Sequence, residues 1–162
     1  MALEAALFYT DAQGIVGENT ISVRADSSEI VEVHHTVHKP TDTQSGRPTG
    51  ARVHGAIKIL KRIDKATPLL YKALTQNQNL PKLELKWYRP DPAGNGEIQH
   101  FYTIEFSDAL VSKQEAWLPN TMVPEQAMFS PMEWVEFNYR TIIWRYEDGG
   151  IEHEDAWTER NV

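Results

Sequence analysis

The sequence predicts a mainly β domain, either a sandwich or a closed barrel, with a single α-helix. Several segments alternate apolar and polar side chains with a period of two, which is typical of half-buried strands. One segment instead has helical spacing between a start and a stop signal. The 162 residues are enough for one hydrophobic core, so residues 1–162 are expected to form a single domain.

Two strands are expected in the first third of the chain. In segment 29–38 valines share one face, and glutamate, threonine and histidine share the other. Segment 53–59 follows, with Lys58 on the face opposite the apolar residues. The residues expected to face the core are Val31, Val33, Val37, Val53, Ile57 and Ile59.

A helix is predicted over about residues 67–78. Thr67 can serve as the N-cap, and Pro68 suits the first helical position, whose N–H has no partner in a helix. Asn77 and Asn79 can adopt the left-handed conformation that ends a helix. An isolated helix this short is marginal in water, so its apolar face must pack on the sheet. That face consists of Leu69, Leu70, Ala73 and Leu74.

A long β-hairpin is predicted next, over residues 82–110. Leu83, Leu85 and Trp87 alternate with charged residues on the outgoing strand. Segment 89–96 holds prolines and glycines and is expected to form the connecting loop. The returning strand is expected to bury an apolar stripe made of Ile98, Tyr102, Ile104, Phe106 and Leu110.

The last long strand, over residues 134–146, changes phase in its middle. Its first apolar residues occupy odd positions and its last ones even positions, so they cannot all face one core in an unbroken strand. A β-bulge near Arg140 and Thr141 would reconcile the two sets. Alternatively, both faces are buried, one in the core and one in an interface. The sequence favours the bulge and leaves both interpretations open.

Two long loops separate the strands. Residues 39–51 contain no apolar side chain larger than proline or alanine, so this loop is expected to be mobile or held by a partner. Residues 119–131 contain three prolines and are expected to be irregular. Trp117 follows a polar stretch and Trp157 lies in an acidic tail. Each of these tryptophans either anchors an interface or packs back onto the core of its own domain.

The charge of the chain bears on its partners. The net charge of −7 argues against nucleic acid. Residues 1–81 carry 9 basic and 8 acidic residues, whereas residues 82–162 carry 7 and 15. The acidic half is either a solvated surface or a face that attracts the unlike face of another copy.

The termini and composition indicate a compartment. The N-terminus lacks a basic region and carries Glu4, so it is not a Sec signal peptide. No apolar run approaches the roughly 18 residues of a membrane-spanning helix. The protein is expected to be made in the cytoplasm and not to insert into membranes, and any export would follow a route that needs no signal peptide. With no cysteine in the chain, disulfides, thiolate metal sites and cysteine nucleophiles are excluded.

A search for catalytic or metal sites gives little. His34 and His38 would lie about 13 Å apart on a strand, too far to share a zinc ion, and His35 would face the other side. The acidic tail 148–155 is expected to be a solvated segment, although two carboxyls about 5 to 9 Å apart across a cleft would suit a glycosidase. The serine-hydrolase elbow, the phosphate loop and the dinucleotide fingerprint are all missing from the sequence. No catalytic residue, metal ligand or cofactor is predicted.

Several runs of sequence carry a family likeness. One leads through a basic strand and Asp64 into the Thr67–Pro68 helix start, and others surround the tryptophans of the second half; they lie at 54–70, 87–89, 101–104, 132–137, 143–150 and 155–157. Their order and spacing resemble the Hcp (haemolysin-coregulated protein) family, the tube subunit of type VI secretion. The likeness covers about residues 4–157.

This resemblance implies a small β-barrel of two antiparallel sheets with one flanking helix. It implies a non-enzymatic subunit, six copies of which form a ring. Rings stack into a hollow tube that is exported on contraction and carries or chaperones effectors. The implied partners are further copies of the chain, the sheath, the spike and small effector proteins. No fused toxin domain is expected beyond Trp157.

The candidate contacts follow from the resemblance and from the surface residues. Loop 39–51 matches the extended loop that bridges stacked rings in the family. The residues assigned to ring stacking or subunit contact are Lys39, Pro40, Thr41, Asp42, Arg47, Pro48, Thr49, Trp117, Asp148, Glu152 and Trp157. Two alternatives stay open: a phage-type tail tube protein and a β-sandwich carbohydrate-active enzyme. Two carboxylates converging in a deep cleft would support the enzyme.

Overall fold

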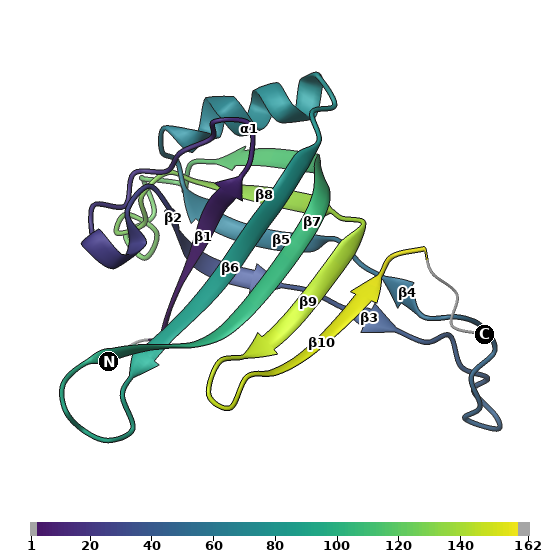
Figure 1. Cartoon of the computed structure of the whole chain (residues 1–162). Coiled ribbons are helices and arrows are strands. Elements are labelled where there is room, and N and C mark those ends of the chain that lie inside the picture. The colour runs from purple at the N-terminus through teal and green to yellow at the C-terminus, as the bar shows by residue number, and fades with distance from the viewer. Residues whose placement is uncertain (1–2, 159–162) are drawn as a thin grey trace.

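The chain forms a closed β-barrel with an α-helix along one edge (Figure 1). The computed structural model describes residues 3–158, so the outermost residues of the predicted domain 1–162 lie outside this range. In chain order, the elements within residues 3–158 are β1 (Glu4–Asp11), the 3-10 turn η1 (Ser22–Arg24), β2 (Ser28–His34), β3 (Val37–His38), β4 (Val53–His54), β5 (Ile57–Arg62), α1 (Ala66–Thr75), β6 (Leu80–Pro90), β7 (Ile98–Trp117), β8 (Met132–Asn138), β9 (Thr141–Tyr146) and β10 (Ile151–Ala156).

The barrel closes because the long strand β7 has different partners along its length. Residues 98–109 pair with β6, residues 102–107 pair also with β9, and residues 110–117 pair with β8. The order β7, β6, β1, β2, β5 and β8 therefore returns to β7, and every pairing is antiparallel. Strands β9 and β10 extend the sheet beyond this closure, and β3 and β4 form a separate ribbon. The predicted mainly β fold class is confirmed.

The barrel interior is filled by the alternating residues of these strands. Leu83 and Leu85 of β6 are fully buried, as predicted, and Trp87 is partly buried against the core. The largest fully buried apolar side chains are Leu7, Ile57, Ile59, Leu70, Leu80, Leu83, Leu85, Phe106, Phe137 and Ile142. Because the sheet closes on itself, each strand that surrounds the core is paired on both sides and none of them has a free edge.

The helix start differs from the prediction. Helix α1 begins at Ala66, one residue before the predicted start, and Thr67 is not its N-cap. The carboxylate of Asp64 accepts a hydrogen bond from the Ala66 N–H at 3.0 Å, and the Thr67 hydroxyl accepts one from the Asp64 N–H at 3.1 Å. Two N–H groups at the helix start are thereby satisfied by side chains three residues apart, as in a capping box.

The helix packs and ends largely as expected. Leu70 and Ala73 are buried in the barrel core, so the predicted apolar face is confirmed. Asn77 has a φ of 49°, in the left-handed region, and follows the end of the helix at Thr75. Asn79 does not adopt this conformation. The helix is therefore shorter than the predicted range.

Strand β2 buries the predicted face only in part, since Val33 packs against the core as predicted but Val31 does not. Val31 is 55% exposed, whereas its neighbour Ile30 is buried. The pairing of β2 with β5 shifts register between Ile30 and Glu32, and this irregularity breaks the alternation that the valines indicate. Val37 and Val53 are also exposed, because they belong to the β3–β4 ribbon rather than to the barrel.

Strand β7 changes face in the same way. Asp108 has a φ of 49°, which an aspartate adopts more readily than most residues and which interrupts the alternation. Beyond it, Ala109 and Val111 are buried and Leu110 is 42% exposed. The predicted apolar stripe is therefore wrong at Leu110, and also at Ile98, which is exposed at the start of the strand.

The phase change in residues 134–146 is a corner between two strands. Strand β8 pairs with β5 and with the second part of β7, whereas β9 pairs with β10 and with the first part of β7. Tyr139 and Arg140 connect them, and the Arg140 N–H donates to the Ser107 carbonyl at 3.0 Å. Tyr139 and Ile142 are both buried because each strand faces the core separately. The predicted bulge is replaced by this corner.

A buried charged group joins four elements around the helix start. The Lys61 ammonium of β5 lies 2.5 Å from the Glu133 carboxylate of β8 and 2.8 Å from that of Asp64. The Thr67 hydroxyl of α1 donates to Glu133 at 2.7 Å, and the Gln114 amide of β7 also donates to it at 2.7 Å. Buried charges of this kind require partners, and here the partners fix the helix on the barrel.

Candidate assembly surface

The β3–β4 ribbon and the loop between its strands form a projecting arm, residues 37–54. Val37 pairs with His54 and His38 with Val53, and the chain then continues away from the barrel. Figure 1 shows this segment extending beyond the sheet, next to β10. The loop predicted at 39–51 therefore forms the outer part of the arm.

The arm is ordered by its own hydrogen bonds. Thr41 and Pro48 form an isolated antiparallel bridge, and the Asp42 N–H donates to the Arg47 carbonyl at 2.9 Å. The Ser45 hydroxyl donates to the Asp42 carboxylate at 2.6 Å, and this bond, with N–H donors of the same turn, lowers the pKa of Asp42. Gly46 has a φ of 67°, which allows the tight turn at the tip. The loop thus has hydrogen bonds of its own, and the mobile and partner-held alternatives both stay predictions.

The predicted contact residues of the arm lie at its surface. Pro40 is half-buried, and the other predicted residues of the arm are exposed, namely Lys39, Thr41, Asp42, Arg47, Pro48 and Thr49. An exposed arm with both lysine or arginine and carboxylate groups can contact a second molecule without first unfolding any part of the barrel.

The remaining predicted contact residues lie in separate places. Trp117 ends β7, is 36% exposed and packs near Phe129. Asp148 is exposed in the β9–β10 turn, and Glu152 of β10 forms an ion pair of 2.8 Å with Arg145. Trp157 lies at the base of the arm, beyond the other end of β10. The structure therefore brings Trp157 close to the arm and keeps Trp117 and Asp148 apart from it.

An anchor cluster of five polar side chains attaches the arm to the barrel. His54 of β4 is fully buried, with Nε2 2.8 Å from the Asp155 carboxylate and Nδ1 2.7 Å from the Tyr139 hydroxyl. Arg52 binds both oxygens of Asp155, and one of its nitrogens donates to the Ala156 carbonyl at 3.1 Å. His35 places Nε2 2.8 Å from the same Tyr139 hydroxyl. We call His35, Arg52, His54, Tyr139 and Asp155 the anchor cluster.

Aromatic rings enclose this cluster. Trp157 stacks on the His54 ring at 5.8 Å and meets the Tyr139 ring edge-on at 4.9 Å, while Trp144 lies on the His54 ring at 6.4 Å. Hydrogen bonds from Arg52 are the main cause that lowers the pKa of Asp155 to about 2, and burial raises the pKa of Tyr139. Asp155 is thus an anion throughout the neutral range and acts only as an acceptor.

Sequence patterns give little indication of this cluster. Its five members come from four separate segments, and Asp155 stands in a run of acidic residues that is typical of a solvated tail. Only the tertiary path of β10 past the base of the arm brings Asp155 to Arg52 and His54.

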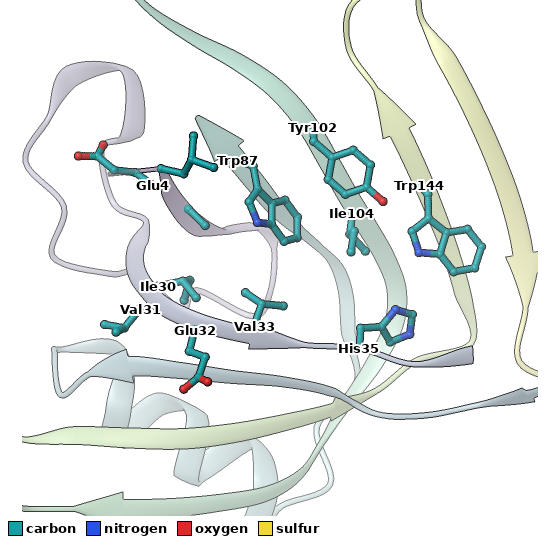
Figure 2. A pocket seen from close by; sticks show the side chains of 12 residues that line it. Glu4, Ile30, Val31, Glu32, Val33, His35, Trp87, Tyr102, Ile104 and Trp144 are labelled. Carbon is teal, nitrogen blue, oxygen red and sulfur yellow. The ribbon is translucent and has the colours of Figure 1, made fainter. Parts of the chain in front are cut away.

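A depression opens between the two sides of the barrel near the anchor cluster. Its volume is about 490 Å³. Figure 2 shows Trp87, Tyr102 and Trp144 on one wall, facing residues of β2. Glu4 and Glu32 lie at its rim and point away from one another; Glu4 is paired with Arg24 at 2.6 Å. These two carboxylates do not converge as the glycosidase alternative requires.

Two further kinds of site were considered, a metal centre built from side-chain ligands and a helix that crosses a membrane. Within residues 3–158, no group of three or more histidine, cysteine, aspartate or glutamate side chains is placed to hold one metal ion. None of the helices in the same range combines the length and apolar character that crossing a membrane requires.

The barrel, its flanking helix and the arm match a known family. The family model described as "Type VI secretion system effector, Hcp" matches residues 9–146. The chain belongs to the Hcp family of type VI secretion proteins, and the resemblance seen in the sequence is confirmed.

Particular relatives agree along most of the chain. The "Major exported protein" of Pseudomonas aeruginosa is 39% identical over 142 residues, which cover 88% of this chain and 81% of the relative. The solved structure of a mutant form of Hcp1 from E. coli EAEC 042 has a TM-score of 0.80 at 31% identity and covers 97% of this chain and 99% of that one. The secreted protein Hcp3 of Pseudomonas aeruginosa has a TM-score of 0.74 at 28% identity and covers 98% of this chain and 100% of that one.

Proposed function

We propose that this chain is a structural subunit of the inner tube of a type VI secretion system. Six copies would form a ring, and rings would stack into a hollow tube. The observation that carries this proposal is membership of the Hcp family, with a family match over residues 9–146. The proposal gives the chain no catalytic residue and no cofactor.

The surface of the chain supports assembly through unlike faces. The arm carries Lys39 and Arg47 at its surface, and the β9–β10 turn carries Asp148 and, just beyond it, Glu152. Contact between such different surfaces is head-to-tail, and head-to-tail contacts close into a ring or continue as a filament. A stacked tube needs both outcomes, one around the ring and one along the axis.

Light scattering and electron microscopy test the proposal. Purified protein should have a mass about six times that of the monomer and appear as rings with a central opening. Because assembly depends on concentration, several concentrations are compared. A strictly monomeric species at the highest concentration would contradict the proposed ring.

Export and cargo form the second part of the proposal. The chain would be assembled in the cytoplasm, leave without a signal peptide when the sheath contracts, and carry or chaperone small effectors. Its partners would be other copies, the sheath, the spike and those effectors, with no role for nucleic acid or membrane insertion. Secretion from cells with an intact sheath is compared with secretion from cells lacking it. Equal export from both would contradict the proposal.

A further inference from the structure

The hydrogen positions in the anchor cluster follow from the ionisation of Asp155. An ionised carboxylate only accepts hydrogen bonds, so His54 must donate to it from Nε2, at 2.8 Å. A neutral imidazole has one donor and one acceptor nitrogen, so Nδ1 of His54 is then the acceptor. The Tyr139 hydroxyl, 2.7 Å away, must therefore donate its proton to Nδ1.

The same reasoning extends to His35. Once the Tyr139 proton points at His54, the hydroxyl oxygen can only accept from the other side. His35 lies 2.8 Å from it through Nε2, so Nε2 carries a proton and donates. The neutral cluster has one satisfied arrangement, in which the donors run from His35 through Tyr139 to His54 and on to Asp155.

One added proton can be accommodated by reversing part of this chain. If His54 becomes a cation, both of its nitrogens donate, and Nδ1–H points at the Tyr139 oxygen. The Tyr139 proton then turns to Nε2 of His35, which accepts it as the other neutral tautomer. Every hydrogen bond of the cluster is still made.

A second proton cannot be accommodated in this way. With His35 and His54 both charged, each directs an N–H at the same hydroxyl oxygen, and the Tyr139 proton is left with the Gly55 carbonyl at 3.4 Å. Two like charges would then flank one hydroxyl group. The buried His54 keeps its ion pair with Asp155. The hydrogen bond that breaks is therefore the one between the half-buried His35 and the Tyr139 hydroxyl.

The charged groups around the cluster do not compensate the positive charge that the second proton adds. Asp155 of β10 is bound on both oxygens by Arg52, and His54 of β4 uses the same carboxylate. Trp144, which lies on the His54 ring, stacks on its other side with His153 of β10. A proton on His153 would add positive charge and could not compensate the charges on His35 and His54. Burial and the nearby His54 both lower the pKa of His35, so a positive charge on His35 is disfavoured in this surrounding.

We propose that Tyr139 makes the arm a proton-controlled element: the arm is held at two points while at most one of His35 and His54 is charged, and at one point when both are. His35 holds the entry to the arm, just before β3, whereas Arg52 and His54 hold its exit at β4. Loss of the His35 contact would leave the arm attached through Asp155 and would loosen its entry, where Thr36 and Val37 pair with Gly55 and His54. This device belongs to the single chain and does not depend on the proposed assembly.

Histidine NMR of the full chain tests the coupling. In the wild type, the midpoint of His35 should lie below the ordinary histidine value of about 6.5, because burial and the nearby His54 lower its pKa. In His54→Gln the midpoint of His35 should rise toward the ordinary histidine value of about 6.5. His34→Gln, at an exposed histidine outside the cluster, is the matched control and should leave the His35 midpoint unchanged.

Hydrogen exchange of the amides at residues 36–38 tests the release of the arm. After correction for the intrinsic effect of pH, exchange should rise about five- to tenfold as the second proton binds, the effect of losing one hydrogen bond. Tyr139→Phe should show the raised exchange already at about pH 7.5, because it lacks the hydroxyl that His35 binds. The amides of β6 and β7 serve as an internal control and should not change. An ordinary midpoint for His35 in the wild type, or pH-independent exchange at residues 36–38, would overturn the proposal.

Discussion

The Lys61 ammonium lies 2.5 Å from the Glu133 carboxylate, and neither side chain is exposed to solvent. This pair links β5 to β8, and Asp64 and Thr67 connect it to the start of α1. A buried pair gives little net stability compared with apolar residues of the same shape, but removal of one partner leaves a buried charge without compensation. Its role is therefore to specify how the helix sits on the barrel.

Replacing Lys61 with methionine should lower the free energy of unfolding by about 3 to 5 kcal/mol, because Glu133 and Asp64 keep their charge without the ammonium. Equilibrium unfolding in urea at neutral pH and fixed protein concentration measures the loss. Lys58→Met, on the same strand but half-exposed, is the matched control and should cost less than about 1 kcal/mol. The double variant Lys61→Met, Glu133→Leu should recover part of the loss. Equal destabilisation by the double and single variants would contradict this account.

The anchor cluster should stabilise the fold in a pH-dependent way through Asp155. Its pKa falls from 3.8 to about 2 in the folded chain, chiefly through hydrogen bonds from Arg52. A lowered carboxyl pKa contributes stability that is present above the unfolded pKa and is lost as pH falls through the folded one. We expect the difference in unfolding free energy between the wild type and Asp155→Asn to shrink as pH falls from about 4 to 2.

Asp148→Asn provides the comparison for that measurement, since Asp148 is exposed in the β9–β10 turn. Chemical unfolding at a series of pH values should give no pH-dependent difference between this variant and the wild type. If Asp155→Asn showed the same flat difference, the Arg52 contact would not control the ionisation of Asp155.

The regular parts of the fold could be predicted from local patterns. The alternation of Leu83 and Leu85 and the apolar face of α1 at Leu70 and Ala73 depend on spacings of two to four residues, which the sequence shows directly. The errors lie where the backbone departs from a regular path. Val31 beside a register shift and Leu110 after the left-handed Asp108 both face solvent, because one irregular residue reverses every side chain that follows.

The anchor cluster could not be predicted for a different reason. Tyr139 and Asp155 reach His54 from 85 and 101 residues away along the chain. No periodicity connects such positions, and each residue taken alone has an ordinary explanation as a core tyrosine or a surface acid. The family resemblance predicted an extended loop at residues 39–51. The contacts that attach the arm to the barrel can be seen only in the tertiary structure.

Gly17 should tolerate no side chain. A Cβ atom there would lie 2.2 Å from the Ser27 carbonyl oxygen and 2.7 Å from the Ser28 nitrogen, and both are backbone atoms that cannot rotate away. Gly17→Ala should therefore lower the free energy of unfolding by at least about 2 kcal/mol. Gly50→Ala is the control, since its nearest neighbour would be the Pro40 ring at 4.0 Å. Thermal unfolding compares the two variants. Equal midpoint temperatures would show that residue 17 does not lie against the backbone of Ser27 and Ser28 in solution.

Shortening the arm should separate folding from stacking. Thr41 and Pro48 are antiparallel bridge partners, so residues 42–47 can be replaced by Asn-Gly, which forms a two-residue hairpin turn. The hydrogen bonds that order residues 42–47 run within the arm, so the free energy of unfolding should change by less than about 1 kcal/mol.

If the arm bridges rings, electron microscopy should show single rings in place of stacks. Arg47→Glu keeps the hairpin and reverses only an exposed charge, so partial loss of stacking would assign the contact to that charge. Loss of soluble protein on shortening would mean that the arm supports the barrel itself, and unchanged stacks would exclude it as the bridging element.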